Sequence, residues 1–402
     1  MVKKQKIVFV LPENGLRVPA TMGGAIETLL TMLLERNEKE RKFQFVFIFP
    51  TSQAEKTYYE CAVCYGCTVK SIGGVAGEFC KKVWIKIGLY FPKLFPRVSK
   101  YYRKACRIAK REKADYVIAE GILPDQFINF GYVWKRESLG THLHNQYVKT
   151  QRCDEIFGKT IAISEFIADR WNEKTPEQWK NTYVLHNCID IDKFNVPISE
   201  ERKNEIRREM GFCPEDFIVI FCGRLVAQKG VKELIDAVLN IDDPAIKLLL
   251  IGSDDFARGD KGKYAQEIKE TVRQNSDKIS HLGYIENGLI YQYYQSADMQ
   301  VIPSTWEEPA GLVVLEGMMS KIPLVITRSG GMVEYVDEEY TEIIPNDENI
   351  VENIRNKILE LKKDSGKRER MAEGAYKWVR QFTSQKYYED FCAIMDDWSY
   401  NK

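Results

Sequence analysis

The sequence has no net charge, few histidines and no long apolar run. Lys plus Arg and Asp plus Glu both number 58, so the overall charge predicts no acidic or basic partner. No stretch reaches the ~18 to 20 consecutive apolar residues that a membrane-spanning helix needs. The apolar run at residues 7–11 is too short for a signal-peptide core and leads directly into Pro12. We therefore expect a cytoplasmic protein whose ten cysteines remain thiols.

Three of these cysteines, Cys61, Cys64 and Cys67, repeat at a spacing used by some iron–sulfur ligands, with Cys80 as a distant fourth. No proline follows Cys67, and the sequence contains no second cluster motif. The spacing therefore favours small buried thiols. An iron–sulfur or zinc site is the alternative.

Short apolar runs alternate with longer helical patterns along the chain, which is typical of an α/β protein with mostly parallel sheets. The pattern restarts near residue 190, so we predict two doubly wound, Rossmann-like domains at residues 1–190 and 191–383. We expect residues 384–402 to pack back on the first domain. Ligands of such sheets bind beyond the carboxyl ends of the strands, so two sheets facing each other would form one interdomain cleft. The predicted strands are residues 7–11, 45–49, 116–119, 139–143 and 160–163, then 217–222, 246–251, 279–282, 299–302 and 323–326.

Two glycine-containing turns can hold phosphate. Gly23 and Gly24 follow the first strand and precede a helix, whose first amides can bind an anion. Their spacing is not that of a dinucleotide fingerprint, and an ordinary tight turn is the alternative. In the second half, Arg224 and Lys229 follow a strand, where two cations can neutralise a diphosphate without magnesium and stabilise a leaving group. Either residue alone could be a solvated surface charge.

The segment at residues 303–316 follows a predicted strand and begins a helix. Glu308 and Glu316 are eight residues apart, which is up to roughly 12 Å at ~1.5 Å per helical residue. That distance is too long for a pair acting on one bond. That length suits the two ends of a folded nucleotide sugar. We expect Glu308 to accept hydrogen bonds from sugar hydroxyls and Glu316 to accept them from a ribose diol. The amides of residues 311–313, which lie between the two glutamates, would bind phosphate oxygens. Glu307 is expected at the surface.

The order of these motifs resembles the large retaining glycosyltransferase family 4, whose members have the GT-B fold. The matching motifs are Gly223-Arg224-Leu225 with Lys229-Gly230, His281-Leu282-Gly283-Tyr284, Pro303-Ser304 with the two glutamates, Gly330-Gly331 with Glu334, and Ile163-Ser164-Glu165-Phe166-Ile167. The resemblance implies that a sugar is transferred from a nucleoside diphosphate with retention of configuration. The donor-binding residues expected from the turns and from the resemblance are Gly23, Gly24, Arg224, Lys229, Tyr284, Ile285, Glu308, Ala310, Gly311, Leu312, Val313 and Glu316.

Three positions depart from the family pattern. Ala310 stands where the family usually has Phe, Lys321 replaces a usual Gly, and Cys188 replaces the Gly of an Asn-Gly-Val-Asp turn. The smaller Ala310 leaves the identity of the donor sugar open. The other two positions bear on turn geometry.

Two of the four histidines, His142 and His144, lie together at the end of a predicted strand. Period-two alternation places both on one face, with His144 nearer the carboxyl end. The resemblance also points to His144, which would hydrogen-bond the transferred sugar, and a structural role is the alternative. No further His or carboxylate accompanies it at ligand spacing, so we predict no metal site. The expected catalytic residues are His144, Glu308, Arg224 and Lys229.

Residues 81–113 carry twelve Lys or Arg, six aromatic residues and one acid, Glu112. Mixed cations and aromatics suit an anionic lipid surface, so we expect peripheral attachment to the inner face of the cell membrane, beside a lipid-linked acceptor. A solvated face is the alternative. Nucleic acid is not expected, because no recognised binding fold accompanies the stretch.

These observations predict a hexosyl- or other glycosyltransferase of cell-surface polysaccharide synthesis. It would use a UDP- or GDP-sugar as donor, a saccharide or lipid-linked acceptor, and no other cofactor. A nucleotide-sugar epimerase, a sugar phosphorylase or a non-catalytic coat or scaffold protein on the same fold is the alternative. Product analysis separates the enzymes, and the intact cations and glutamates of the second half argue against a scaffold. The base, sugar, acceptor, linkage and oligomeric state stay open.

Overall fold

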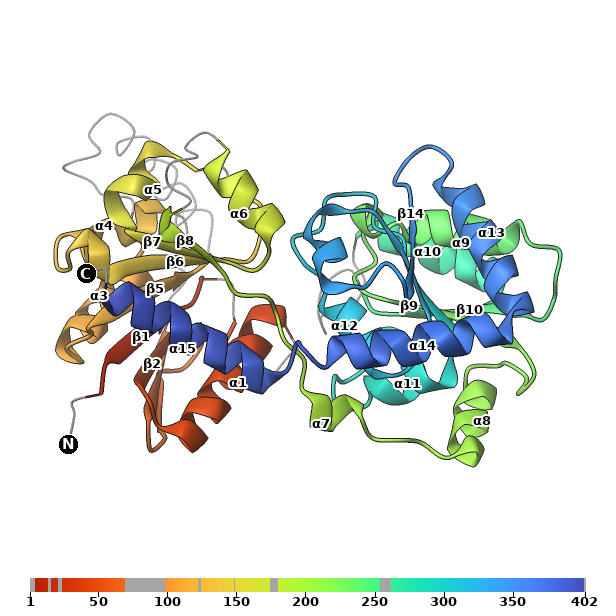
Figure 1. Cartoon of the computed structure of the whole chain (residues 1–402), viewed down its shortest axis with the longest axis horizontal. Coiled ribbons are helices and arrows are strands. Elements are labelled where there is room, and N and C mark those ends of the chain that lie inside the picture. The colour runs from red at the N-terminus through yellow and green to blue at the C-terminus, as the bar shows by residue number, and fades with distance from the viewer. Residues whose placement is uncertain are drawn as a thin grey trace. The chain divides into compact units, whose positions relative to one another are not determined.

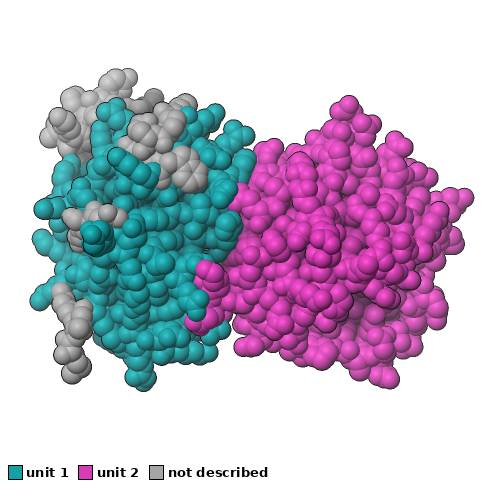
Figure 2. Space-filling model, viewed as in Figure 1, with its two compact units in different colours: residues 1–186, 387–402 teal, residues 187–386 magenta. Residues whose placement is uncertain are grey.

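The computed structural model describes residues 4–13, 16–20, 24–68, 98–121, 124–147, 149–173, 180–253 and 262–400. The chain forms two compact units, shown in different colours in Figure 2. Unit 1 comprises residues 1–186 and 387–402, and unit 2 comprises residues 187–386. The sequence placed these boundaries after residues 190 and 383. Gly23, Cys80 and residues 81–97 of the basic stretch lie outside the described residues.

Unit 1 contains an eight-stranded sheet in the order β3-β4-β2-β1-β5-β6-β7-β8. Neighbouring strands are parallel, except for the antiparallel pair of β3 and β4. The strands are β1 (Lys6–Val10), β2 (Gln44–Thr51), β3 (Glu55–Tyr58), β4 (Ala62–Thr68), β5 (Tyr116–Glu120), β6 (Leu139–Leu143), β7 (Lys159–Ala162) and β8 (Thr182–Val184). Longer helices and short turns are α1 (Ala25–Glu40), α3 (Lys100–Arg111), η1 (Pro124–Phe127), α4 (Ile128–Gly131), η2 (Arg136–Ser138), α5 (Gln151–Ile156) and α6 (Glu165–Asn172).

The sequence did not predict β3, β4 or β8. Strand β3 lies at the sheet edge with mostly exposed side chains, and the residues of β8 are half-buried, so neither has an apolar run. Strand β4 contains a glycine and two cysteines, Cys64 and Cys67, rather than a continuous run of large apolar side chains. Both thiols and that of Cys61 are buried, as the sequence favoured. Cys64 and Cys67 are three residues apart in a strand, so their side chains point to opposite faces and cannot converge on one ion.

The last helix, α15 (Ser384–Tyr400), packs on the sheet of unit 1 (Figure 1). Its Phe391 contacts the rings of Phe9 and Phe45 at centroid distances of 5.9 and 6.0 Å. Trp398 is fully buried, and its indole N–H donates to the carbonyl oxygen of Glu137 at 2.6 Å. The helix thus buries most of its aromatic residues in the core of unit 1 although it lies at the other end of the sequence.

Unit 2 contains a six-stranded parallel sheet in the order β11-β10-β9-β12-β13-β14. Alternate residues of β9 enter different core layers: Ile218 and Ile220 one, Val219 and Phe221 the other. This two-sided burial explains the continuous apolar runs that predicted the strands. The strands are β9 (Phe217–Cys222), β10 (Ile246–Ile251), β11 (Ile279–His281), β12 (Met299–Ile302), β13 (Leu324–Thr327) and β14 (Thr341–Ile344). The helices and turns are α7 (Ile191–Phe194), α8 (Glu200–Glu209), η4 (Ala227–Lys229), α9 (Val231–Leu239), α10 (Lys263–Gln274), α11 (Ile290–Ser296), α12 (Leu312–Met319), η5 (Gly330–Tyr335), α13 (Ile350–Lys363) and α14 (Ser365–Val379).

Within the described part of the chain, no helix combines the length and apolar character needed to cross a bilayer.

Candidate functional site

The cationic turn after β9 lies against the loop that follows β12. Gly230 has φ +67°, and a Cβ atom there would lie 1.8 Å from the carbonyl oxygen of Pro303. Only glycine therefore allows the two backbones to approach this closely. As a result, Lys229, at the end of η4, reaches Glu308: its Nζ donates to Oε1 at 2.6 Å. Two residues 79 positions apart thus form one ion pair.

Glu308 is the centre of this cluster, with only 4% of its surface exposed. The Ser304 hydroxyl also donates to its Oε1, at 2.5 Å. Its backbone carbonyl accepts from the amide of Gly331 at 2.7 Å, and its amide donates to the Ser329 hydroxyl at 3.3 Å. Three segments that are separate in the sequence therefore meet at one buried residue, two of them at its carboxylate and the third at its backbone. Glu307, by contrast, is exposed, as expected.

Helix α12 begins directly beyond this carboxylate. Its N-cap is Gly311, and no side chain caps the helix. The amides of Leu312 and Val313 therefore belong to a helix start without a side-chain partner, where the helix dipole favours an anion. Ala310, before the cap, packs against the core of unit 2.

Glu316 lies one turn further along α12 and is half-buried. Its Oε2 accepts from the hydroxyl of the fully buried Tyr294 at 3.0 Å. Burial raises the pKa of Glu316, although the Tyr294 hydrogen bond and the charge of Lys193 act in the opposite direction. Glu316 is thus held by a hydrogen bond from a buried neighbour rather than being fully solvated on the helix surface.

The other predicted donor residues of unit 2 lie near the surface. Arg224 is exposed, and among the described residues it forms no ion pair. Tyr284 is 38% exposed, whereas Ile285 packs against the core. Because the Arg224 guanidinium is exposed and forms no ion pair among the described residues, it can reach a phosphate without breaking an existing ion pair.

In unit 1 the predicted anion site at the start of α1 already faces a carboxylate. The amide of Gly24 donates to Oε1 of Glu27 at 3.0 Å, and the amide of Arg17 donates to its Oε2 at 3.2 Å. Glu27 is 1% exposed. The amide that the sequence assigned to a phosphate is therefore bound by a side chain of the same helix.

His144 belongs to a buried cluster with His142 and Glu120. The two rings lie 4.1 Å apart between centroids, which confirms that both share one face of the strand. Nε2 of His144 lies 2.7 Å from Oε2 of Glu120, and Nδ1 of His142 lies 3.1 Å from the same atom. The statement that no further His or carboxylate accompanies His144 is therefore wrong: potential ligand atoms of all three residues lie within 4.8 Å of one another.

The sequence missed Glu120 because it comes from a different strand. β5 and β6 pair in parallel, with Glu120 opposite His142. A glutamate at the end of an apolar strand was the available signal, since the ends of adjacent parallel strands meet at one sheet edge. Only the register between β5 and β6 shows which residue it faces.

The charges of this cluster follow from burial and proximity. Burial alone would raise the pKa of Glu120, but the two histidines outweigh it and lower that pKa to about 2. Burial, and then the neighbouring His142, lower the pKa of His144 to about 4. At neutral pH the cluster therefore holds an anionic carboxylate beside a neutral His144 ring.

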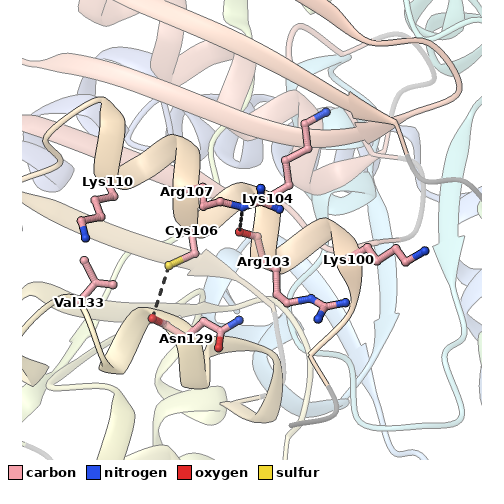
Figure 3. Close-up of a pocket in the computed structure, with 8 residues that line it drawn as sticks. All are labelled: Lys100, Arg103, Lys104, Cys106, Arg107, Lys110, Asn129 and Val133. Atoms are coloured by element: carbon pink, nitrogen blue, oxygen red, sulfur yellow. Dashed lines mark hydrogen bonds between the residues drawn. The ribbon is translucent and has the colours of Figure 1, made fainter. Parts of the chain in front are cut away.

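A cationic cavity of about 680 Å³ lies between α3 and the α4 region of unit 1 (Figure 3). Its cations recur at helical spacing along one face of α3, while the opposite face is buried. Among the described residues these cations form no ion pair with a carboxylate. The lining residues are Lys100, Arg103, Lys104, Cys106, Arg107, Lys110, Asn129 and Val133.

Two doubly wound parallel-sheet units in one chain define the GT-B class of fold. HepE of Anabaena, in its crystal structure with UDP, matches this fold with a TM-score of 0.71 at 17% identity, over 98% of this chain and 100% of that chain. Residues 202–378, within unit 2, match the family described as Glycosyl transferases group 1.

Two further proteins are similar to part of this chain. An uncharacterized glycosyltransferase of Methanocaldococcus jannaschii is 30% identical over 199 residues, covering 49% of this chain and 48% of that protein. Spore coat protein SA of Bacillus subtilis is 24% identical over 240 residues, covering 57% of this chain and 63% of that protein. The chain thus matches about half to two thirds of the length of these relatives.

Proposed function

We propose that the chain transfers a sugar from a nucleoside diphosphate sugar to a saccharide or lipid-linked acceptor, without a metal ion. The observation that carries this proposal is the Lys229–Glu308 pair beside the uncapped start of α12. It combines a cation for a diphosphate, helix amides for its oxygens and a buried carboxylate for sugar hydroxyls. The exposed Arg224 supplies the second positive charge.

We propose these roles for the individual side chains. Arg224 and Lys229 neutralise the diphosphate and stabilise the negative charge that develops on it as it leaves. Glu308 accepts hydrogen bonds from the sugar, and Glu316, held by Tyr294, accepts them from the ribose. His144 contacts the transferred sugar.

The reaction would break the bond between the anomeric carbon and the phosphate oxygen and form a bond from that carbon to the acceptor oxygen. The acceptor proton passes to the departing phosphate, so no protein nucleophile is required. Retention of configuration is the stereochemical course that we propose. The two cations take the role that a divalent ion has in metal-dependent transferases.

A uridine diphosphate sugar is the donor that we favour, because HepE was crystallised with UDP. A guanosine diphosphate sugar is the other candidate. A role in cell-surface polysaccharide synthesis, at the cytoplasmic side of the membrane, is in keeping with the similarity to a spore coat protein. Analysis of the product with and without an acceptor separates a transferase from an epimerase.

Thermal denaturation with a panel of nucleoside diphosphates in EDTA tests the donor site. A ligand at 100 times its Kd stabilises the native state by about 2.7 kcal/mol, which corresponds to a rise in Tm of roughly 5–10 °C for a unit of this size. We expect this rise with UDP or GDP and its loss in the Arg224→Met, Lys229→Met double variant. A panel in which no nucleotide shifts Tm without added metal would contradict the proposal.

We also propose that the cationic face of α3 binds anionic lipid. Each Lys or Arg near an anionic surface contributes about 1 kcal/mol, so removal of three is expected to abolish detectable binding. Co-sedimentation with vesicles of phosphatidylglycerol and phosphatidylcholine at low salt measures it. The test variant is Lys100→Glu, Arg103→Glu, Arg107→Glu, and the control reverses three exposed cations of unit 2, Lys232, Lys263 and Arg273. Equal sedimentation of the two variants would disprove a lipid site on α3.

A further inference from the structure

The buried Glu120 has no role in the function proposed above, yet its carboxylate forms a hydrogen bond with His144. Its side chain is 0% exposed, and one of its carboxylate oxygens, Oε2, contacts a ring nitrogen of each of the two histidines. Its other oxygen, Oε1, and Nε2 of His142 are buried without a hydrogen-bond partner among the described residues. A carboxylate in such a position is costly to bury, so the two imidazole contacts are what stabilise it.

The distance between Glu120 and His144 fits a hydrogen bond rather than two ligands of one metal ion. Zinc lies about 2.0–2.2 Å from nitrogen and oxygen ligands in a tetrahedral site, which separates ligand atoms by roughly 3.3 Å. Oε2 of Glu120 and Nε2 of His144 are only 2.7 Å apart, which is a hydrogen-bond distance. An ion between these two atoms would have to push them apart.

An ionised carboxylate only accepts hydrogen bonds, so a nitrogen that contacts it carries the proton. His144 is then protonated at Nε2, and Nδ1 keeps its lone pair. No described residue hydrogen-bonds to Nδ1 of His144. The ring therefore presents an acceptor, not a donor, on its other side.

We propose that Glu120 is a positioning residue that fixes His144 as the Nε2–H tautomer, so that Nδ1 accepts a hydrogen bond from a hydroxyl of the transferred sugar. This inference rests on the proposed function in naming the sugar. The fixing of the tautomer itself is a property of the chain alone. Outer-shell partners that orient a functional histidine are worth 10–100-fold at metal sites, and we expect a similar loss in kcat/KM for Glu120→Gln.

Nitrogen-15 NMR of the histidine rings in the full-length chain at neutral pH tests the tautomer directly. The chain has four histidines, and single His→Asn variants assign their signals. His281 is an internal reference, because its Nε2 lies 2.8 Å from the carbonyl oxygen of Gly252 and must donate to it. We expect His144 to show the same protonation pattern as His281 in the wild type. In Glu120→Gln, whose amide can donate as well as accept, we expect the signals of His142 and His144 to change and His144 to lose this pattern, while Glu120→Asp retains part of it.

Three results would overturn the inference. One is a His144 ring protonated at Nδ1 in the wild type, a result that can be obtained even if Glu120→Gln fails to fold. Another is an unchanged tautomer in a folded Glu120→Gln. The third is a stoichiometric zinc ion, detected by native mass spectrometry, that shifts the His142 and His144 signals together. A wild type with the expected tautomer that never transfers sugar would instead count against the proposed function only.

Discussion

Replacing Arg224 and Lys229 together by methionine is expected to lower kcat/KM for sugar transfer by about 10³-fold or more. Removal of a single group that stabilises developing charge costs about 10²–10³-fold, and the two cations here are proposed to act on the same leaving diphosphate. The assay is donor turnover in EDTA. Under these conditions the wild type is expected to keep its full rate, since fixed cations receive the charge.

Loss of Lys229 also leaves the buried Glu308 carboxylate without its cation, which destabilises the fold. The variant Lys229→Met, Glu308→Gln separates the loss of stability from the loss of catalysis. It removes the unpaired carboxylate of Glu308 but does not restore a cation for the diphosphate. We expect it to regain stability and remain inactive. Lys232→Met is the matched control: Lys232 is an exposed cation on the next helix, paired with Asp236. Undiminished turnover in the double methionine variant, or rates that depend on added manganese, would refute the proposed role of the cations.

Gly230→Ala is expected to destabilise unit 2 by about 3 kcal/mol or more, through a left-handed backbone and an overpacked contact. The added Cβ would lie 1.8 Å from the carbonyl oxygen of Pro303, so the turn after β9 has to move away from the loop after β12. That movement separates Lys229 from Glu308. We therefore expect a fall in Tm of roughly 6–12 °C together with a loss of donor binding, measured by thermal denaturation and by nucleotide titration.

Gly211→Ala is the matched control for this change. Gly211 has φ +82°, and a Cβ atom there would meet nothing within 4 Å. We expect Gly211→Ala to lower the free energy of unfolding by only about 1–2 kcal/mol, because a left-handed backbone is unfavourable for alanine. Donor binding is expected to stay intact. Equal destabilisation by the two substitutions would show that the contact with Pro303 does not hold the site together.

Periodicity and turn chemistry predicted the regular parts of this fold. Continuous apolar runs such as residues 217–222 and 246–251 correspond to β9 and β10, because both faces of a parallel sheet are buried. The edge strands β3, β8 and β14 were missed, since they are short and lack such runs, whereas the edge strand β11 was predicted. The glycines, cations and glutamates after the strands of unit 2 could be found because each lies at a strand end or a helix start, which the sequence marks locally.

The sequence by itself determined two doubly wound units and the residue types gathered at the strand ends of unit 2. These follow from local rules, namely burial on both sheet faces, helix starts and turn residues. Only the tertiary structure decided that Lys229 pairs with Glu308, that Glu27 binds the amide of Gly24, and that Glu120 holds His144. The Lys229–Glu308 and Glu120–His144 contacts join parts of the chain that are distant in the sequence. The first depends on the close backbone approach at Gly230 and the second on the register between β5 and β6, and no local sequence pattern specifies either.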